Sequence, residues 1–283
     1  MTVTDTYTIT YTARTITYTL SGVDATTGLT IQYLGDQGFG LAPLHRITTR
    51  GPLQDGDSDI DFRLDPRVMQ LPLVVMNTDA RPRYQHYEIR EKLLQIFRPG
   101  DNATITVTRN NGTTTKTRRI NVKVLGGLSF DVDPNGYHVR TVVQLRASDP
   151  TWFDPNNQQF IYTSAFIGST RTITTTGNWN VFPYDIGITG PITNAKITNN
   201  TTGQFIEFTG TISAGTSYLI NLSYGVKTVV DNLGANQISK VTPASNLATW
   251  SLLPGNNVIA VTGTGTTVAT QVSFNFNDRF TGI

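Results

Sequence analysis

Apolar and polar residues alternate along much of this chain, which is the pattern of half-buried β-strands. From residue 2 to residue 13, threonine occupies almost every even position, and mainly apolar or aromatic residues occupy the odd ones. The phase then reverses, because the apolar residues of ITYTL (16–20) are even-numbered. A slip of one residue would turn every apolar side chain to the wrong face. We therefore expect a bulge or a turn near Ala13–Thr15.

A second alternating stretch is DSDIDFRLD at 57–65. The period of two predicts one apolar face and one face with charges of both signs, which suits solvent or a polar partner surface. The apolar face carries Ile60, Phe62 and Leu64, and the charged face carries Asp59, Asp61, Arg63 and Asp65. The next run, VMQLPLVVM (68–76), predicts a more buried strand, and Pro72 indicates an edge or a bulge.

One segment, Tyr84–Phe97, has the period of a helix, with apolar residues at i, i+4, i+7 and i+8. Pro99-Gly100 ends it. Two strand pairs follow, joined by tight-turn sequences at Asn111-Gly112 and at 133–136, DPNG. The first part of the chain therefore predicts a β-barrel or β-sandwich with one helix and a β-hairpin.

After the segment ASDPTWF (147–153), short strands alternate with breakers rich in glycine, proline and asparagine, and no helical period appears. This pattern predicts an all-β sandwich or jelly roll. The fold class is thus mainly β, with an N-terminal domain over 1–150 and a C-terminal jelly roll over 151–283.

Composition narrows the function. Charged residues make up 15% of the chain and its net charge is +2, which argues against nucleic-acid binding through a basic surface. The chain has no cysteine, so disulfides, zinc–thiolate sites and cysteine nucleophiles are excluded. Its start, MTVTDTYTIT, lacks the regions of a signal peptide, and LPLVVM (71–76) falls far short of the roughly 18 residues that span a bilayer. We therefore expect neither export through a secretion channel nor membrane insertion.

No motif for chemistry stands out. The histidines, His45, His86 and His138, are isolated from one another and predict structural roles. The aspartates at 55–61 fail as a calcium loop, because its sixth position would be Ile60 and its twelfth Pro66. A glycosidase needs paired carboxylates, and Glu207 is the only glutamate of the second half. We therefore expect no catalytic residue, no cofactor site and no metal site.

Sugar binding without catalysis is an alternative, because β-sandwiches hold saccharides against exposed aromatic rings. Trp179 in GNWNVFP and Trp250 in ATWSLLPG are the candidates for this stacking. Each is followed by apolar residues and a proline, so core packing is the competing interpretation. Trp179 is the stronger stacking candidate.

The order of these segments resembles that of phage distal tail proteins. The resemblance rests on RITTRGPLQDGDSDIDFRLDPRVMQLPL (46–73), on a helix of the R-x-x-L-x-x-x-F-x-P type and on the ASDPTWF elbow. The helix motif is matched by Arg90, Leu93, Phe97 and Pro99. The second half, from GNWNVFP to the closing FTGI, is similar to the galectin-like or carbohydrate-module-like jelly roll of these proteins.

This resemblance implies a structural virion protein of a long-tailed phage, assembled in the bacterial cytoplasm and located at the distal end of the tail. Such proteins form a homohexameric ring between the tail tube protein and the tail hub, and the genome passes through it without specific binding. The outer domain contacts receptor-binding proteins or a host glycan. From the alternating charges we predict a subunit interface at Asp59, Asp61, Arg63, Asp65 and Arg67. A glycan-binding protein that uses Trp179 and a glycan hydrolase that uses Glu207 are the alternatives.

Overall fold

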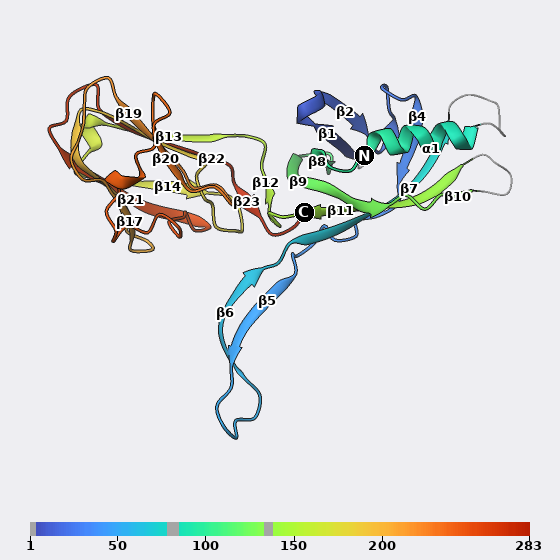
Figure 1. Cartoon of the computed structure of the whole chain (residues 1–283), viewed down its shortest axis with the longest axis horizontal. Coiled ribbons are helices and arrows are strands. Elements are labelled where there is room, and N and C mark those ends of the chain that lie inside the picture. The colour runs from blue at the N-terminus through green and yellow to red at the C-terminus, as the bar shows by residue number, and fades with distance from the viewer. Residues whose placement is uncertain (1–3, 78–84, 133–137) are drawn as a thin grey trace. The chain divides into compact units, whose positions relative to one another are not determined.

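The structure is a computed structural model that describes residues 4–77, 85–132 and 138–283. The chain divides into two compact units (Figure 1). Unit 1 contains Met1–Phe153 together with Thr281–Ile283, and unit 2 contains Asp154–Phe280. The last three residues, which the sequence-based division assigned to the second domain, thus lie in unit 1. No helix among the described residues is long and apolar enough to cross a membrane.

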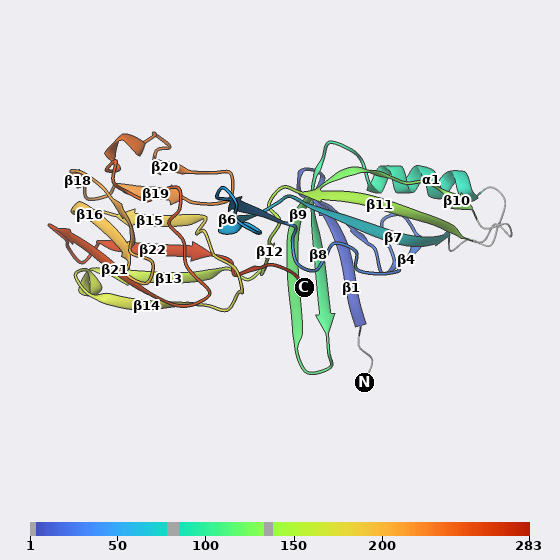
Figure 2. The ribbon, with the colours of Figure 1, turned by 90° about the horizontal axis from the view of Figure 1, so that it is seen from below.

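Unit 1 is built on one large antiparallel sheet that curls into a nearly closed barrel (Figure 2). Its strand order is β2-β1-β8-β9-β11-β7-β4-β3, with β10 paired to β11 and β12 paired to β9. The strands are β1 (Thr4–Tyr11), β2 (Ile16–Thr19), β3 (Gly22–Val23), β4 (Leu29–Tyr33), β7 (Arg67–Asn77), β8 (Asn102–Asn110), β9 (Thr115–Gly127), β10 (Asp131–Val132), β11 (Val139–Ala147) and β12 (Trp152–Phe153).

The change of phase after residue 13 is absorbed by a turn, as predicted. A short 3-10 helix, η1 (Thr12–Arg14), separates β1 from β2, and Thr15 has a left-handed φ of 54°. Because of this turn, Tyr7 and Ile9 of β1 and Tyr18 of β2 all point into the core.

The predicted edge or bulge at Pro72 is wrong, because β7 lies inside the sheet between β11 and β4 and its register with β11 is continuous. Pro72 is tolerated there because the missing N–H faces the side on which β4 has already ended. Its carbonyl oxygen accepts a hydrogen bond from the backbone N–H of Leu34 at 3.0 Å, one residue beyond β4. The ladder to β11, where Pro72 lies opposite Val142, therefore loses no hydrogen bond to the proline.

The helix α1 (Gln85–Ile96) lies where the period predicted it, and it packs against β7 (Figure 2). The predicted stripe of Ile89, Leu93, Ile96 and Phe97 is buried, which fixes the face that the helix presents to the sheet. Tyr84 and the turn at 133–136 lie outside the described residues.

A hairpin arm, formed by β5 (Leu44–Thr49) and β6 (Ser58–Leu64), pairs with no other strand among the described residues. Figure 1 shows it projecting from the barrel of unit 1. The strand register shifts between Ile47 and Thr48, so Ile60 has no residue opposite it. The arm is therefore a twisted, two-stranded ribbon with both faces open to solvent.

Unit 2 is a sandwich of two antiparallel sheets, with strand orders β13-β22-β15-β19-β20 and β14-β21-β16-β17; β18 pairs with β16. The strands are β13 (Gln158–Thr163), β14 (Thr170–Thr175), β15 (Asp185–Thr189), β16 (Ile192–Asn199), β17 (Gln204–Glu207), β18 (Thr211–Ile212), β19 (Ser217–Asn221), β20 (Thr228–Asp231), β21 (Gly255–Thr264) and β22 (Gln271–Phe276). A short strand, β23 (Arg279–Phe280), follows them and belongs to neither sheet of the sandwich. Two 3-10 helices complete it, η2 (Ser164–Phe166) and η3 (Ile238–Lys240). Isoleucine and valine side chains from both sheets fill the core. The predicted mainly β fold class is confirmed.

Candidate functional site

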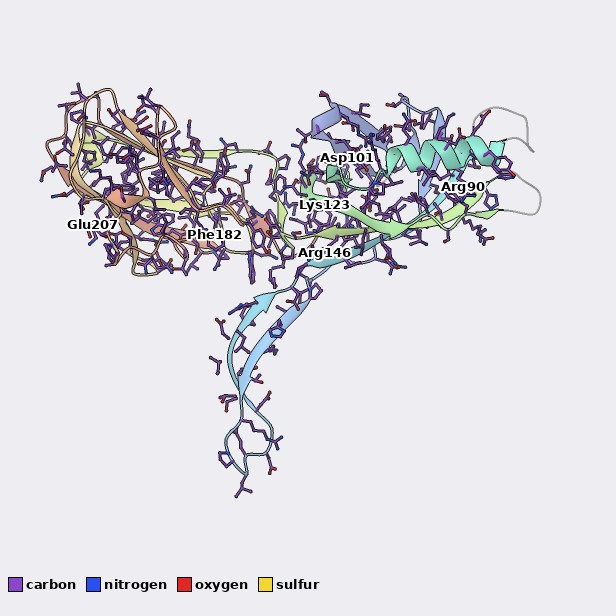
Figure 3. All side chains as sticks on the ribbon, viewed as in Figure 1. Arg90, Asp101, Lys123, Arg146, Phe182 and Glu207 are labelled. Carbon is purple, nitrogen blue, oxygen red and sulfur yellow. The ribbon has the colours of Figure 1, made fainter. Side chains whose placement is uncertain are left out.

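The arm carries large apolar side chains that are largely exposed to solvent. Leu53 at its tip is fully exposed, and Ile60 and Phe62 on β6 keep 64% and 48% of their surfaces in solvent. Figure 3 shows side chains projecting from both faces of the ribbon. The sequence predicted one apolar and one charged face, and large side chains of both kinds are exposed on the arm. Clustered apolar exposure of this kind is typical of a surface that a partner protein covers.

The charged residues predicted for a subunit interface lie mostly on this arm. Asp59 forms an ion pair with Arg46 across the strands at 2.8 Å, and both side chains are well exposed. Asp61, Arg63 and Asp65 are also exposed. Because an exposed pair contributes only about 0–1 kcal/mol to stability, these charges are available to a partner at little cost to the fold.

Arg67 does not share this position, and its assignment to an interface is wrong. Its side chain is only 1% exposed, and it points into unit 1. The guanidinium donates to four backbone carbonyl oxygens: Nε to Pro150 at 3.0 Å, Nη1 to Gly38 at 2.8 Å and to Gly40 at 2.6 Å, and Nη2 to Thr281 at 2.6 Å. The planar guanidinium, with its fixed set of N–H donors, is suited to binding several carbonyl oxygens at once. Because the side chain is buried, a partner protein could not reach it.

A second polar cluster joins β1, β8 and the loop after β4. The Tyr7 hydroxyl donates to Asp36 at 3.0 Å, and Arg109 forms ion pairs with Asp36 and, at 3.6 Å, with Asp5. Burial raises the pKa of Tyr7 to about 12 and also raises the pKa of the neighbouring Tyr33. Such shifts keep both phenols protonated and therefore poor as bases or nucleophiles.

The carboxylates of unit 2 do not form a hydrolytic pair in the described contacts. Glu207 on β17 forms an ion pair with Lys196 at 3.5 Å, while the buried Asp278 accepts hydrogen bonds from the backbone N–H and hydroxyl of Thr176. Asp185 accepts a hydrogen bond from Asn275 at 3.2 Å. Each carboxylate is thus held by its own local partner. Over residues 4–77, 85–132 and 138–283, no group of three or more His, Asp or Glu side chains is placed to hold a metal ion.

The two tryptophans considered for sugar stacking differ in exposure. Trp250 is completely buried and stacks on Phe274, with ring centroids 6.1 Å apart, so it is a core residue. Trp179 is half-buried, and its backbone N–H donates to the carbonyl oxygen of Arg279 at 3.2 Å. Stacking of a glycan on Trp179 stays a prediction.

Comparison with known proteins agrees with this architecture. Residues 176–280 match the SPP1 Dit family model, described as the C-terminal domain of a siphovirus-type tail component. Unit 2 is thus similar in sequence to a tail-component domain. A search of the curated proteins found no match.

Among solved structures, the crystal structure of the SPP1 Dit (gp 19.1) protein is similar to this chain, with a TM-score of 0.67 and 14% identity. That match covers 97% of this chain and 99% of the other, and the SPP1 protein is described as a paradigm of the hub adsorption apparatus in phages infecting Gram-positive bacteria. A chain of the phage P2 baseplate in its activated conformation with Ca also matches, with a TM-score of 0.51, 9% identity, and coverage of 97% and 98%. The resemblance to siphophage distal tail proteins is therefore confirmed, by sequence in unit 2 and by fold along the whole chain.

Proposed function

We propose that this protein is a structural component of a phage virion, located at the distal end of the tail. There it forms a hexameric ring that joins the tail tube to the hub of the tip complex, and the genome passes through the ring. The observation that carries the proposal is the agreement of two findings: a tail-component match over 176–280 and a distal-tail fold over 97% of the chain.

The hairpin arm supplies a surface suited to ring closure. A ring needs a heterologous interface, in which one patch of a subunit meets a different patch of the next. The arm offers exposed apolar side chains for burial and exposed charges for register. We therefore assign the arm, with Asp59, Asp61, Arg63 and Asp65, to the contact with a neighbouring copy.

The role is architectural and not enzymatic. Glu207 pairs with Lys196, and Asp185 accepts a hydrogen bond from Asn275. Burial raises the pKa of Tyr7 and Tyr33 further above neutrality. The partners are further copies of this chain, the tail tube protein and a hub protein, with receptor-binding proteins on the outer domain. The genome passes through the ring and is not specifically bound by it.

Subunit counting tests the proposal directly. We expect native mass spectrometry and electron microscopy to show closed hexamers, either of the purified chain or after addition of tail tubes. A particle that stays monomeric under both conditions would sink the proposal.

The arm can be tested with the double variant Ile60→Ser and Phe62→Ser. We expect it to stay monomeric with an unchanged circular dichroism spectrum, because both side chains are exposed in the free chain. The matched control is Leu219→Ser with Val258→Ser in unit 2, where the exposed fractions are 40% and 38%. The control should assemble like the wild type; equal assembly of both variants would remove the arm from the interface.

A further inference from the structure

The solvent face of four neighbouring strands of unit 1 is coated with threonine. On β1 the even-numbered residues point outwards while Tyr7, Ile9 and Tyr11 fill the core. The strands beside β1 repeat this arrangement. The threonine face comprises Thr6, Thr8 and Thr10 on β1, Thr17 and Thr19 on β2, Thr104, Thr106 and Thr108 on β8, and Thr117, Arg119 and Asn121 on β9.

The strand register aligns these residues into cross-strand rows (Figure 2 shows β1, β8 and β9 side by side). The rows are Thr117–Thr108–Thr6, then Arg119–Thr106–Thr8–Thr19, then Asn121–Thr104–Thr10–Thr17. Side chains within the rows bond to one another: the hydroxyls of Thr10 and Thr17 lie 2.9 Å apart and those of Thr108 and Thr117 lie 3.1 Å apart. Thr104 donates to the Asn121 side chain at 2.9 Å. The threonine face is therefore a grid of hydroxyl groups held by hydrogen bonds, called the grid below.

The chemistry of the grid limits what it can meet. It presents no large apolar side chain, so burying it against another protein would gain little hydrophobic free energy. The three rows contain no carboxylate and one cation, Arg119 on β9; the exposed Lys123 lies two residues beyond Asn121 on β9, opposite Asn102 of β8. Many lysine or arginine side chains would bind phosphate through counterion release, and carboxylates would repel a polyanion, but the rows carry only Arg119. Short β-branched side chains do not reach out from the sheet. A solvated, nearly neutral wall of this kind lets a duplex slide past.

We infer that the threonine face lines the central channel and faces the passing duplex DNA. This inference rests on the proposed ring and adds which strands form its wall. Two surfaces of unit 1 thus have different roles: the arm contacts a neighbouring copy of the chain, and the threonine face lines the channel without binding DNA.

The absence of cysteine makes a clean labelling experiment available. The variants Thr8→Cys and Thr106→Cys each carry a single thiol on the grid, and Thr172→Cys carries one on an exposed position of β14 in unit 2. After reaction with a gold-cluster maleimide, electron microscopy of the rings locates the label. We expect density inside the pore for the two grid variants and outside it for the unit 2 control.

Charge provides a second readout. Rings with Thr8→Lys and Thr106→Lys should bind a short linear duplex at least tenfold more tightly at low salt than rings with Thr172→Lys and Thr174→Lys, which add the same charge to unit 2. Wild-type rings should show no retention. Grid labels on the periphery, or equal DNA binding by both lysine variants, would overturn the inference while leaving the ring intact. If no ring forms, the proposed function fails as well.

Discussion

Replacement of Arg67 by methionine should destabilise unit 1 strongly, although no carboxylate faces this side chain in the described contacts. Methionine has similar length but cannot donate hydrogen bonds. Four carbonyl oxygens, those of Gly38, Gly40, Pro150 and Thr281, would lose their donor. Burial lowers the pKa of Arg67 to about 10, so the side chain is still a cation at pH 7 and all four bonds are charge-assisted.

The size of the effect follows from these carbonyls. An unsatisfied buried polar group costs about 1–3 kcal/mol, and the four at the lower bound give about 4 kcal/mol. The methionine variant no longer buries a cation, and this gain offsets part of any cost above the lower bound. For a unit of this size, 1 kcal/mol corresponds to about 2–4 °C in Tm, so we expect the Tm of unit 1 to fall by about 10 °C. Arg67→Lys should lie between wild type and Arg67→Met, because one ammonium cannot reach acceptors on several sides.

Scanning calorimetry can separate the two units if they unfold in distinct transitions. The transition of unit 1 should move in Arg67→Met and that of unit 2 should stay. The control Arg63→Met removes an exposed guanidinium from β6 and should change stability by no more than about 0.5 kcal/mol. A loss below about 1 kcal/mol in Arg67→Met, or an equal loss in the control, would refute the reasoning from buried carbonyls.

Three further predictions concern other positions. Gly282→Ala should weaken unit 1 by about 1–3 kcal/mol in urea unfolding, because a Cβ there would lie 2.8 Å from the carbonyl carbon and oxygen of Gly40, whereas Gly35→Ala, with open space around it, should be nearly neutral. Burial raises the pKa of Tyr162 to about 12 from about 10 in the unfolded chain, so its stabilisation is complete below pH 10 and is lost as pH rises to 12. Tyr162→Phe should therefore flatten the alkaline decline of unit 2 stability by about 2 kcal/mol at pH 12, and an unchanged slope would contradict this cause. On a glycan array, any wild-type signal should vanish in Trp179→Ala if this ring is the platform; a retained signal would assign sugar binding elsewhere.

Local patterns in the sequence predicted those features that depend on near neighbours. The stripe at Ile89, Leu93 and Ile96 fixed the helix, because residues three and four apart share one helical face. The phase reversal around residue 13 required a turn, and η1 supplies it. The β-sandwich of unit 2 was predicted from short strand patterns separated by glycine-, proline- and asparagine-rich turns, which are also local signals.

Features set by distant parts of the chain were not visible in the pattern. Arg67 follows an alternating stretch whose other charges face solvent, but its acceptors lie 27 to 214 residues away in sequence. Pro72 indicated an edge or a bulge. The sequence could not show that the neighbouring strand β4 ends at Tyr33, opposite Leu73, and so does not extend alongside Pro72. Alternation predicted two different faces for the arm, but it could not show that Ile60 and Phe62 stay exposed, because it does not report whether a second layer packs on the strand.

The return of the chain to unit 1 changes how its domains should be separated. The chain leaves unit 1 after Phe153 and re-enters it at Thr281, and Arg67 binds carbonyl oxygens just before the exit and at the re-entry. Ile283 then donates its backbone N–H to the Phe39 carbonyl oxygen at 3.2 Å. The elbow is also fixed to unit 1, since Trp152 is buried against Phe39. Truncation at residue 150 would remove Trp152 and leave part of the guanidinium fork unpaired. A short linker from Phe153 to Thr281 keeps these contacts, so that variant should fold as an independent unit while the simple truncation should not.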